Sequence, residues 1–223
     1  MQRYSNRYEA GKVLAESLAT YRTHQHVIVL ALPRGGVPVG FEVAKALKVP
    51  LDVFIVRKLG VPGHSELAMG ALAMGGITVF NDHVIADCHV SSDAIKAVLT
   101  QEQQELARRM IAYRGHEDFP LLQDKTVILV DDGVATGATM RAAIKAIKQL
   151  KAQMIVVAVP VADKQIVEEL QMLVDDFICP MQPNGLYAVG AWYEDFSQTE
   201  DEEVYSLLKE SRKFIVSHNG YHA

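Results

Sequence analysis

Two adjacent acids, Asp131 and Asp132, stand where an apolar run meets a turn of small residues. Residues 127–130 have the composition of a buried strand, and residues 133–139 lead into an amphipathic helical pattern near Met140. Free N–H groups in such a turn and at a helix start attract an anion, and two carboxylates can accept hydrogen bonds from neighbouring hydroxyls. The stretch therefore predicts a site for a ribose phosphate.

Competing phosphate and metal motifs fit this stretch less well. A Walker loop needs a lysine, but no lysine is near Ala138, which stands five residues after Gly133. A dinucleotide fingerprint needs GxGxxG, and the spacing of Gly133 and Gly137 does not provide it. In a receiver-type metal pocket the two acids would bind the metal ion, but such a pocket does not explain the turn of small residues that follows them. An ordinary turn with a capping threonine is the plain structural alternative.

A second glycine-rich loop, Pro-Arg-Gly-Gly at residues 33–36, follows the apolar run 26–31. Its two glycines let backbone amides approach an anion closely, and Arg34 adds a forked cationic donor. Arg57 and Lys58 follow a further apolar run, 51–56, and offer two more cations. The alternatives are a plain glycine turn for the first segment and a solvated loop with incidental charge for the second.

The elements expected around these loops alternate between helix and strand. We expect helices near residues 6–21, 37–47, 92–114, 139–150, 163 onward and 200–216, and core strands near 26–31, 51–56, 127–131, 154–159 and 174–179. Residues 57–70 hold three glycines and a proline and are expected to form a long mobile loop, followed by a small β excursion at 71–80. Five parallel strands alternating with helices predict that ligands gather at the carboxyl ends of the strands.

Composition restricts the class of protein. The 223 residues carry a net charge of −5, which makes the chain a poor general binder of nucleic acid. Cys88 and Cys179 have no metal or redox spacing, so two reduced cysteines are expected. His83 and Asp87 suit one helical face but lack a second pair of ligands, so no metal site is predicted. The N-terminus has no apolar signal core, and we expect a cytoplasmic protein.

The strand, the acid pair and the turn ending in Thr-Gly-Ala-Thr resemble the phosphoribosyl pyrophosphate (PRPP) motif of type I phosphoribosyltransferases. The looser resemblance, through RKLGVPG, AMGAL and the AVGAWY tail, runs nearly end to end. It implies a single domain over residues 1–223, with a central, mostly parallel five-stranded sheet flanked by helices. A small variable hood, drawn from about 60–120 and 183–223, and a long loop would complete it.

The resemblance also implies roles for particular residues. Asp131 and Asp132 would hold the ribose 2′- and 3′-hydroxyls, and Arg34, Gly35 and Gly36 would form a pyrophosphate loop with a non-proline cis peptide at Arg34–Gly35. Arg57 and Lys58 would reach the pyrophosphate from a loop that closes over the site. Mg²⁺ would be bound mainly through PRPP. The remaining members of the PRPP motif, which would wrap the 5′-phosphate, are Gly133, Val134, Ala135, Thr136, Gly137, Ala138 and Thr139.

The expected reaction is phosphoribosyl transfer from PRPP to a nitrogenous base or related amine, with release of pyrophosphate, as part of nucleotide metabolism. Asp131, Asp132, Arg34 and Lys58 are the expected catalytic residues. Family members that act on 6-oxopurines carry an acid three positions after the second acid of the motif, and this chain has Ala135 there. The departure argues against hypoxanthine or guanine and leaves the acceptor open.

Base-binding candidates are weaker. Glu66, with His64 beside it, lies in the expected mobile loop, and Trp192 and Tyr193 lie in the aromatic tail. Aromatic faces stack on planar bases, but these rings could equally pack against the terminal helix. A homodimer is expected by resemblance alone. The alternative to an enzyme is a regulatory protein that binds PRPP without turning it over.

Overall fold

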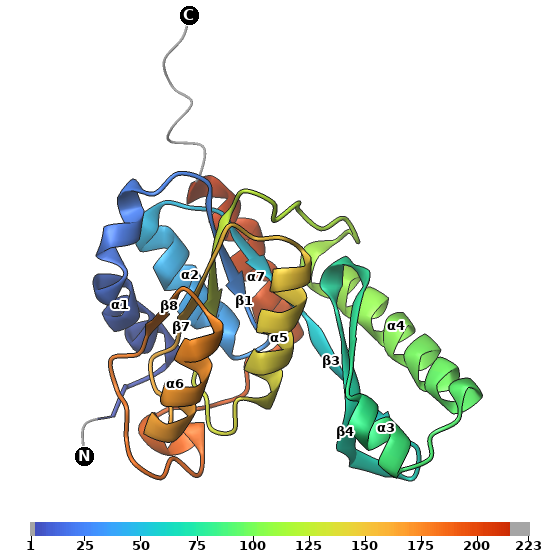
Figure 1. The fold of residues 1–223 in the computed structure, drawn as a ribbon. Helices are drawn as coiled ribbons and strands as arrows, with labels where there is room; N and C mark the ends of the chain where they lie inside the picture. The colour runs from blue at the N-terminus through green and yellow to red at the C-terminus, as the bar shows by residue number, and fades with distance from the viewer. Residues whose placement is uncertain (1–2, 215–223) are drawn as a thin grey trace, which may run out of the picture.

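The computed structural model describes residues 3–214, and its centre is a five-stranded parallel sheet (Figure 1). The strand order is β2-β1-β6-β7-β8. The predicted α/β fold with a five-stranded parallel sheet is confirmed. The strands are β1 (Val27–Ala31), β2 (Leu51–Val53), β6 (Thr126–Val130), β7 (Met154–Ala158) and β8 (Asp176–Ile178).

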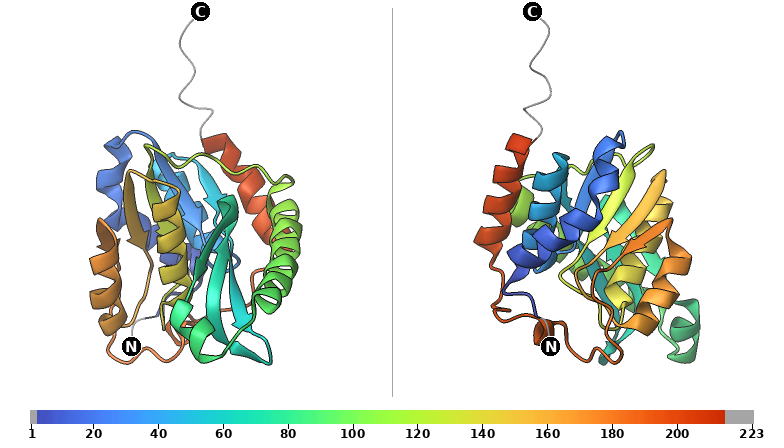
Figure 2. Two further views of the ribbon diagram at one scale, coloured as in Figure 1. Left: turned by 45° about the vertical axis from the view of Figure 1, so that its right-hand side comes forward. Right: turned by 90° about the vertical axis from the view of Figure 1, so that its left-hand side faces the viewer.

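Helices cover both faces of this sheet. Every residue of its central strands β1 and β6 is therefore buried, whichever face its side chain points to. Val29 and Ile128 pack with helices α1 (Arg7–Ser17) and α2 (Gly36–Leu47) on one face. On the other face, Leu30 and Leu129 pack with α5 (Ala138–Gln149) and α6 (Lys164–Leu170). Figure 2 shows the two layers edge-on, with α1 and α2 in blue and α5 and α6 in yellow and orange.

Residues 57–70 do not form the expected long loop. They lie in an antiparallel hairpin of β3 (Val56–Val61) and β4 (His64–Ala73), which β5 (Ile77–Phe80) extends into a three-stranded sheet. The glycines that suggested a loop allow close backbone contact within the sheet. A Cβ on Gly60 would lie 2.8 Å from the carbonyl oxygen of Ser65, and one on Gly70 would lie 2.6 Å from that of Val79.

The hairpin forms an arm at the side of the molecule together with α3 (Asp82–Asp87) and α4 (Ser92–Arg114) (Figure 1). The side chain of Ser91 caps the start of α4, and Gly115 ends it in the left-handed conformation. Helix α7 (Asp201–Ser211) packs against both α4 and α2 and so joins the arm to the sheet.

The chain between β8 and α7 crosses the carboxyl edge of the sheet and includes a short 3₁₀ turn, Val189–Trp192. The helix expected over 200–216 is α7 plus the 3₁₀ turn Arg212–Phe214, and its last two residues lie outside the described part of the chain. No helix within residues 3–214 combines the length and the apolar character needed to cross a membrane.

Candidate functional site

The two glycine-rich loops predicted from the sequence meet at the carboxyl edge of the parallel sheet. Strands β1 and β6 are neighbours, with Ala31 opposite Val130, so the loops that follow them lie side by side. The N–H of Leu32 donates to the carbonyl of Val130 at 2.8 Å and closes the gap between them. The fold therefore brings residues 33–36 and 131–139 into one site.

Glycines 35 and 36 are required by the acids that they contact. A Cβ on Gly35 would lie 2.0 Å from Oδ2 of Asp132, and one on Gly36 would lie 2.9 Å from Cα of Asp131. Gly35 has φ −60° and ψ −31°, a helical conformation that any residue adopts. Space beside the carboxylates, rather than backbone freedom, is thus what selects glycine at position 35.

Arg7 is a member of the site that the sequence reasoning missed. Its Nε donates to Oδ2 of Asp132 at 2.8 Å, and the two side chains are only 11% and 14% exposed. Its guanidinium stacks on the ring of Phe196 at 3.9 Å, and its NH1 group donates to the carbonyl of Ser197 at 2.7 Å. A cation in the first turn of a helix is unfavourable because it opposes the helix dipole. The position of Arg7 at the start of the predicted first helix was therefore the one feature of the sequence that could have suggested a special role for it.

The negative charges of the acid pair are unfavourable because the two carboxylates are buried and lie close together. Burial raises the pKa of Asp131 well above its ordinary value, and the neighbouring charge of Asp132 raises it further. Burial also raises the pKa of Asp132, although the hydrogen bond from Arg7 opposes that rise. Oδ1 of Asp131 accepts the backbone N–H of Asp132 at 2.8 Å. A ligand that brings hydroxyl donors or a cation would relieve this accumulation of negative charge.

The turn after the acids presents a run of free backbone donors. None of the N–H groups of residues 135–139 donates to another group within the described residues. Gly137 takes the left-handed conformation, φ 74°, immediately before α5, and that helix starts without a side-chain cap or an acid in its first turn. Consecutive free N–H groups at a helix start form an anion site.

Gly133 and Val134 hold the turn in place through packing and a backbone hydrogen bond. A Cβ on Gly133 would lie 2.5 Å from the side chain of Val189. The N–H of Val134 donates to the carbonyl of Val161 at 2.9 Å, which ties the turn to the loop after β7. These contacts fix the backbone of the residues that follow in the turn.

Arg34 is held by the start of α7. Its NH1 group lies 3.3 Å from Oδ1 of Asp201 and 3.8 Å from the carboxylate of Glu200, and its side chain is 32% exposed. The non-proline cis peptide expected at Arg34–Gly35 lies one bond earlier, at Pro33–Arg34. The sequence contains nothing that distinguishes the two bonds, so the expected position was wrong by one residue.

Comparison with known proteins agrees with this geometry. Residues 5–184 match the Phosphoribosyl transferase domain family. The chain belongs to this family. Two curated Mycobacterium tuberculosis relatives, the putative phosphoribosyl transferases MT0597 and Rv0571c, are each 42% identical over 213 residues, which is 96% of this chain. The alignment spans 48% of each relative, so the chain covers about half of their length.

A solved structure has the same overall fold as this phosphoribosyl transferase domain. The protein TT1426 from Thermus thermophilus is 38% identical and superposes with a TM-score of 0.81, covering 94% of this chain and 99% of that one. The similarity includes the arm as well as the sheet, because nearly all of both chains is matched.

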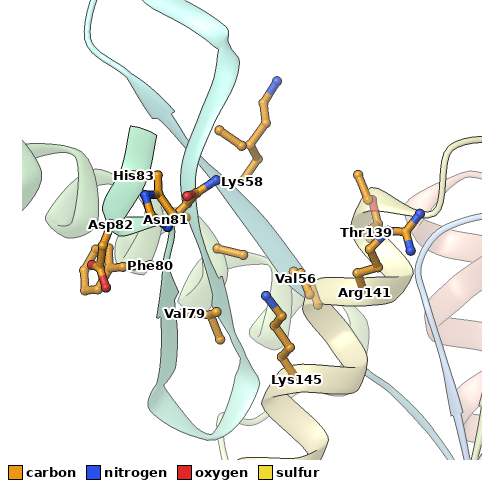
Figure 3. A pocket seen from close by; sticks show the side chains of 15 residues that line it. Val56, Lys58, Val79, Phe80, Asn81, Asp82, His83, Thr139, Arg141 and Lys145 are labelled. Atoms are coloured by element: carbon orange, nitrogen blue, oxygen red, sulfur yellow. The ribbon is translucent and has the colours of Figure 1, made fainter. Parts of the chain in front are cut away.

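Arg57 and Lys58 lie on opposite faces of the hairpin, as strand alternation requires. Arg57 faces α4, where its Nε donates to Glu102 at 2.7 Å. Lys58 faces α5 and lines a cavity of about 520 Å³ between that helix and the antiparallel sheet (Figure 3). Of the two cations, only Lys58 therefore shares a cavity with Ala138 and Thr139 of the glycine-rich turn.

The weaker base-binding candidates are not among the residues that line that cavity. Glu66 and His64 stand exposed near the hairpin tip, where Glu66 approaches Lys58 at 3.4 Å. Trp192 lines a separate cavity with Tyr4 and Met181.

Tyr193 is only 3% exposed and cannot offer a ring face to a base in this conformation. Its hydroxyl donates to the carbonyl of Asp132 at 2.5 Å, and its ring packs on Tyr4 and Phe196. Tyr193 thus supports the backbone of the acid pair.

The carboxylates of the acid pair suit a Mg²⁺ ion that takes most of its other ligands from the oxygens of a bound phosphate. Asp131 and Asp132 offer hard carboxylate oxygens, and Mg²⁺ in phosphate sites is commonly held by one or two carboxylates plus substrate oxygens. Within residues 3–214, no three side chains of His, Cys, Asp or Glu come together as a metal cluster.

Proposed function

We propose that the site binds PRPP and transfers its phosphoribosyl group to a nitrogenous acceptor, releasing pyrophosphate. The observation that carries the proposal is the run of free N–H groups at residues 135–139 directly beside the buried acid pair. Amides at a helix start suit the 5′-phosphate, and Asp131 and Asp132 suit the ribose 2′- and 3′-hydroxyls. Membership of the phosphoribosyl transferase family supports the same substrate.

In the proposed reaction, the bond from ribose C1 to the pyrophosphate oxygen breaks, and pyrophosphate leaves with the bonding electrons. A lone pair on the acceptor nitrogen forms the new bond to C1, and the acceptor proton passes to solvent. Positive charge develops on the sugar and negative charge on the leaving group. Catalysis by this domain would therefore consist mainly of positioning and electrostatic stabilisation.

The chain supplies groups of both signs for these charges. Asp131 and Asp132 lie where the sugar becomes positive, and the loop of Arg34, Gly35 and Gly36 lies beside them for the pyrophosphate. Lys58 approaches from the hairpin. Mg²⁺ bound through PRPP would supply further neutralisation of the leaving group. Arg34 must exchange its carboxylate partners, Glu200 and Asp201, for pyrophosphate oxygens.

The hood of the proposed enzyme would come from the arm and from the tail after β8, since the arm shares a cavity with Ala138 and Thr139 and the tail binds Asp132 through Tyr193. We propose a cytoplasmic protein that acts in nucleotide metabolism. A homodimer is proposed from the resemblance alone.

The experiment that tests PRPP binding is calorimetric titration with Mg²⁺ and PRPP. Asp131→Asn combined with Asp132→Asn should abolish binding, because amides weaken the hydroxyl anchors and remove the counter-charge for the metal. Asp124→Asn is the matched control. Asp124 is exposed, lies just before β6 at the opposite edge of the sheet, and has a φ of 61°, which asparagine tolerates well. Unchanged affinity in the double variant would refute the site.

The second candidate function is a regulatory protein that binds PRPP without turnover. The ion pairs that hold Arg34 favour it, because they occupy the cation that pyrophosphate needs. Pyrophosphate release from PRPP across a panel of bases separates the two. Retained PRPP binding with no release from any base would select the regulatory protein.

A further inference from the structure

The start of α7 brings two acids to the one cation of the loop at residues 33–36. The NH1 group of Arg34 lies 3.3 Å from Oδ1 of Asp201 and 3.8 Å from the carboxylate of Glu200. In the proposed function, on which this inference rests, the same guanidinium binds pyrophosphate. Carboxylates and phosphates both accept charge-assisted hydrogen bonds from arginine, so the two acids engage a donor that the ligand needs.

The other donors of this loop remain open. Within residues 3–214, the backbone N–H groups of Arg34 and Gly35 donate to no acceptor. Helix α2 begins at Gly36 with neither a side-chain cap nor an acid in its first turn. The side chain of Arg34 is therefore the part of the loop that the acids of α7 occupy, while the amides stay available to an anion.

The acids at the start of α7 do more than stabilise that helix. Asp201, Glu202 and Glu203 form its first turn, where negative charge complements the helix dipole. Glu202 forms no ion pair within residues 3–214, whereas Asp201 reaches Arg34. Glu203 accepts from the hydroxyl of Tyr8 at 2.7 Å. The dipole accounts for acids at this helix start, but it does not require Asp201 to face the loop.

The arm holds Asp201 in front of Arg34. Oδ1 of Asp201 accepts from the hydroxyl of Tyr113 at 3.2 Å, and Tyr113 belongs to α4 and is only 2% exposed. Helix α7, red in Figure 2, packs beside α4, which is green. The position of the carboxylate is thus fixed by a buried donor as well as by Arg34.

Separation of Arg34 from the two acids leaves no buried charge without a partner. The side chains of Arg34, Asp201 and Glu200 are 32%, 38% and 64% exposed, and ion pairs at such sites are weak. Once Arg34 turns away, Asp201 keeps the hydroxyl of Tyr113, and Glu200 keeps the side-chain amide of Gln198 at 3.4 Å. A strongly charged ligand can therefore displace both acids.

We propose that Glu200 and Asp201 make an autoinhibitory contact, in which they compete with the pyrophosphate group of PRPP for Arg34. Binding of PRPP separates Arg34 from the two acids, and Tyr113 retains Asp201 on the arm. The contact lowers the affinity for PRPP but not for a sugar phosphate that lacks pyrophosphate. Occupancy of the loop thereby removes one link between the parallel sheet and the arm.

Calorimetric titration with Mg²⁺ and PRPP tests the competition, and ribose 5-phosphate is the matched ligand without pyrophosphate. Asp201→Asn removes the negative charge but keeps a side-chain oxygen that can accept from Tyr113. We expect the affinity for PRPP to rise by about three- to fivefold, which corresponds to the upper range for an exposed ion pair. The affinity for ribose 5-phosphate should not change.

Glu202→Gln is the control, because Glu202 is exposed in the same turn of α7 and forms no ion pair within residues 3–214. It should leave both affinities unchanged. In an Arg34→Gln background, Asp201→Asn should no longer raise the affinity for PRPP, because the competition acts through Arg34. An equal rise in both backgrounds would show a general effect of charge and overturn the proposal.

Thermal unfolding shows whether each variant is folded. Glu200→Gln is the second variant, since Glu200 precedes α7 and is largely exposed, and it should raise PRPP affinity less than Asp201→Asn does. Unchanged PRPP affinity in both variants would overturn the proposal. A lower affinity in Asp201→Asn would also overturn it, because Asp201 would then position Arg34 for the ligand. Failure of the unmodified protein to bind PRPP would instead refute the proposed function, so the two failures are distinguishable.

Discussion

The replacement of Gly35 by alanine tests the contact between the two loops of the site. Backbone conformation alone favours alanine, because Gly35 is helical and a compatible Gly-to-Ala change stabilises a protein by about 0.4–1 kcal/mol through the unfolded state. The structure predicts the opposite. The new Cβ would lie 2.0 Å from Oδ2 of Asp132, whereas ordinary contact begins at 3.4 Å.

The required movement follows from those two distances. Either Asp132 or the loop must shift by at least about 1.4 Å, the difference between 3.4 and 2.0 Å, and the 2.8 Å bond from Arg7 would be strained or lost. Overpacking of this kind costs about 1–3 kcal/mol of stability. Loss of a hydrogen bond to a charged group costs about 1.5–3 kcal/mol, which corresponds to roughly 10- to 100-fold in an equilibrium constant. Because the displaced carboxylate is the proposed anchor of the ribose hydroxyls, we expect PRPP affinity to fall by about 10- to 100-fold in Gly35→Ala.

Thermal unfolding and calorimetric titration with Mg²⁺ and PRPP measure the two effects separately. Gly115→Ala is the control, since its Cβ would meet no atom within 4 Å but its φ of 76° is unfavourable for alanine. It should lower stability by about 1–2 kcal/mol and leave affinity unchanged. In an Asp132→Ala background, Gly35→Ala should lose most of its destabilising effect. A Gly35→Ala protein as stable as the wild type, with unchanged affinity, would refute the reasoning.

Three further predictions concern charge. Because the folded-state pKa of Asp131 is raised, its contribution to stability falls as pH rises above the unfolded value of about 3.8. Asp131→Asn should therefore raise the melting temperature of the ligand-free protein at pH 7 and flatten the decline of that temperature as pH rises above the unfolded value. Arg7→Gln should raise the pKa of Asp132 further, so that PRPP affinity falls more at pH 6 than at pH 8 in titrations, with partial rescue by Arg7→Lys. Lys58→Gln should weaken PRPP binding about tenfold, whereas Arg57→Gln should lower thermal stability alone; equal losses of affinity would contradict the assignment of the two side chains to opposite faces.

The parts of the site that could be predicted from sequence are local in the chain. Residues 127–139 combine an apolar strand, two acids and a turn, and the structure has β6, the acid pair and the start of α5 in that order. Helix α4 was also predictable, because its periodicity runs from a capping serine to a terminal glycine. In both segments, neighbouring residues determine the structure.

The remaining parts depend on contacts between distant residues. Arg7 and Asp132 are 125 positions apart, and Tyr193 and Asp132 are 61 apart, so no local pattern identifies either pair. The hairpin was misread for a related reason. Gly60 and Gly70 look like loop residues in isolation, and their role in close strand contact appears only when Ser65 and Val79 are placed beside them.

The first helix and the tail after β8 both support Asp132. Arg7 of the first helix binds the carboxylate of Asp132, and Tyr193 of the tail binds its backbone carbonyl. Phe196, also in the tail, stacks on the guanidinium of Arg7. The core of the sheet alone would fix the backbone of the acid pair but would leave its buried charge uncompensated. Stability and ligand affinity should consequently oppose each other at Asp131, where the raised pKa reflects an unfavourable charge, and should fall together at Arg7, where the cation offsets that charge.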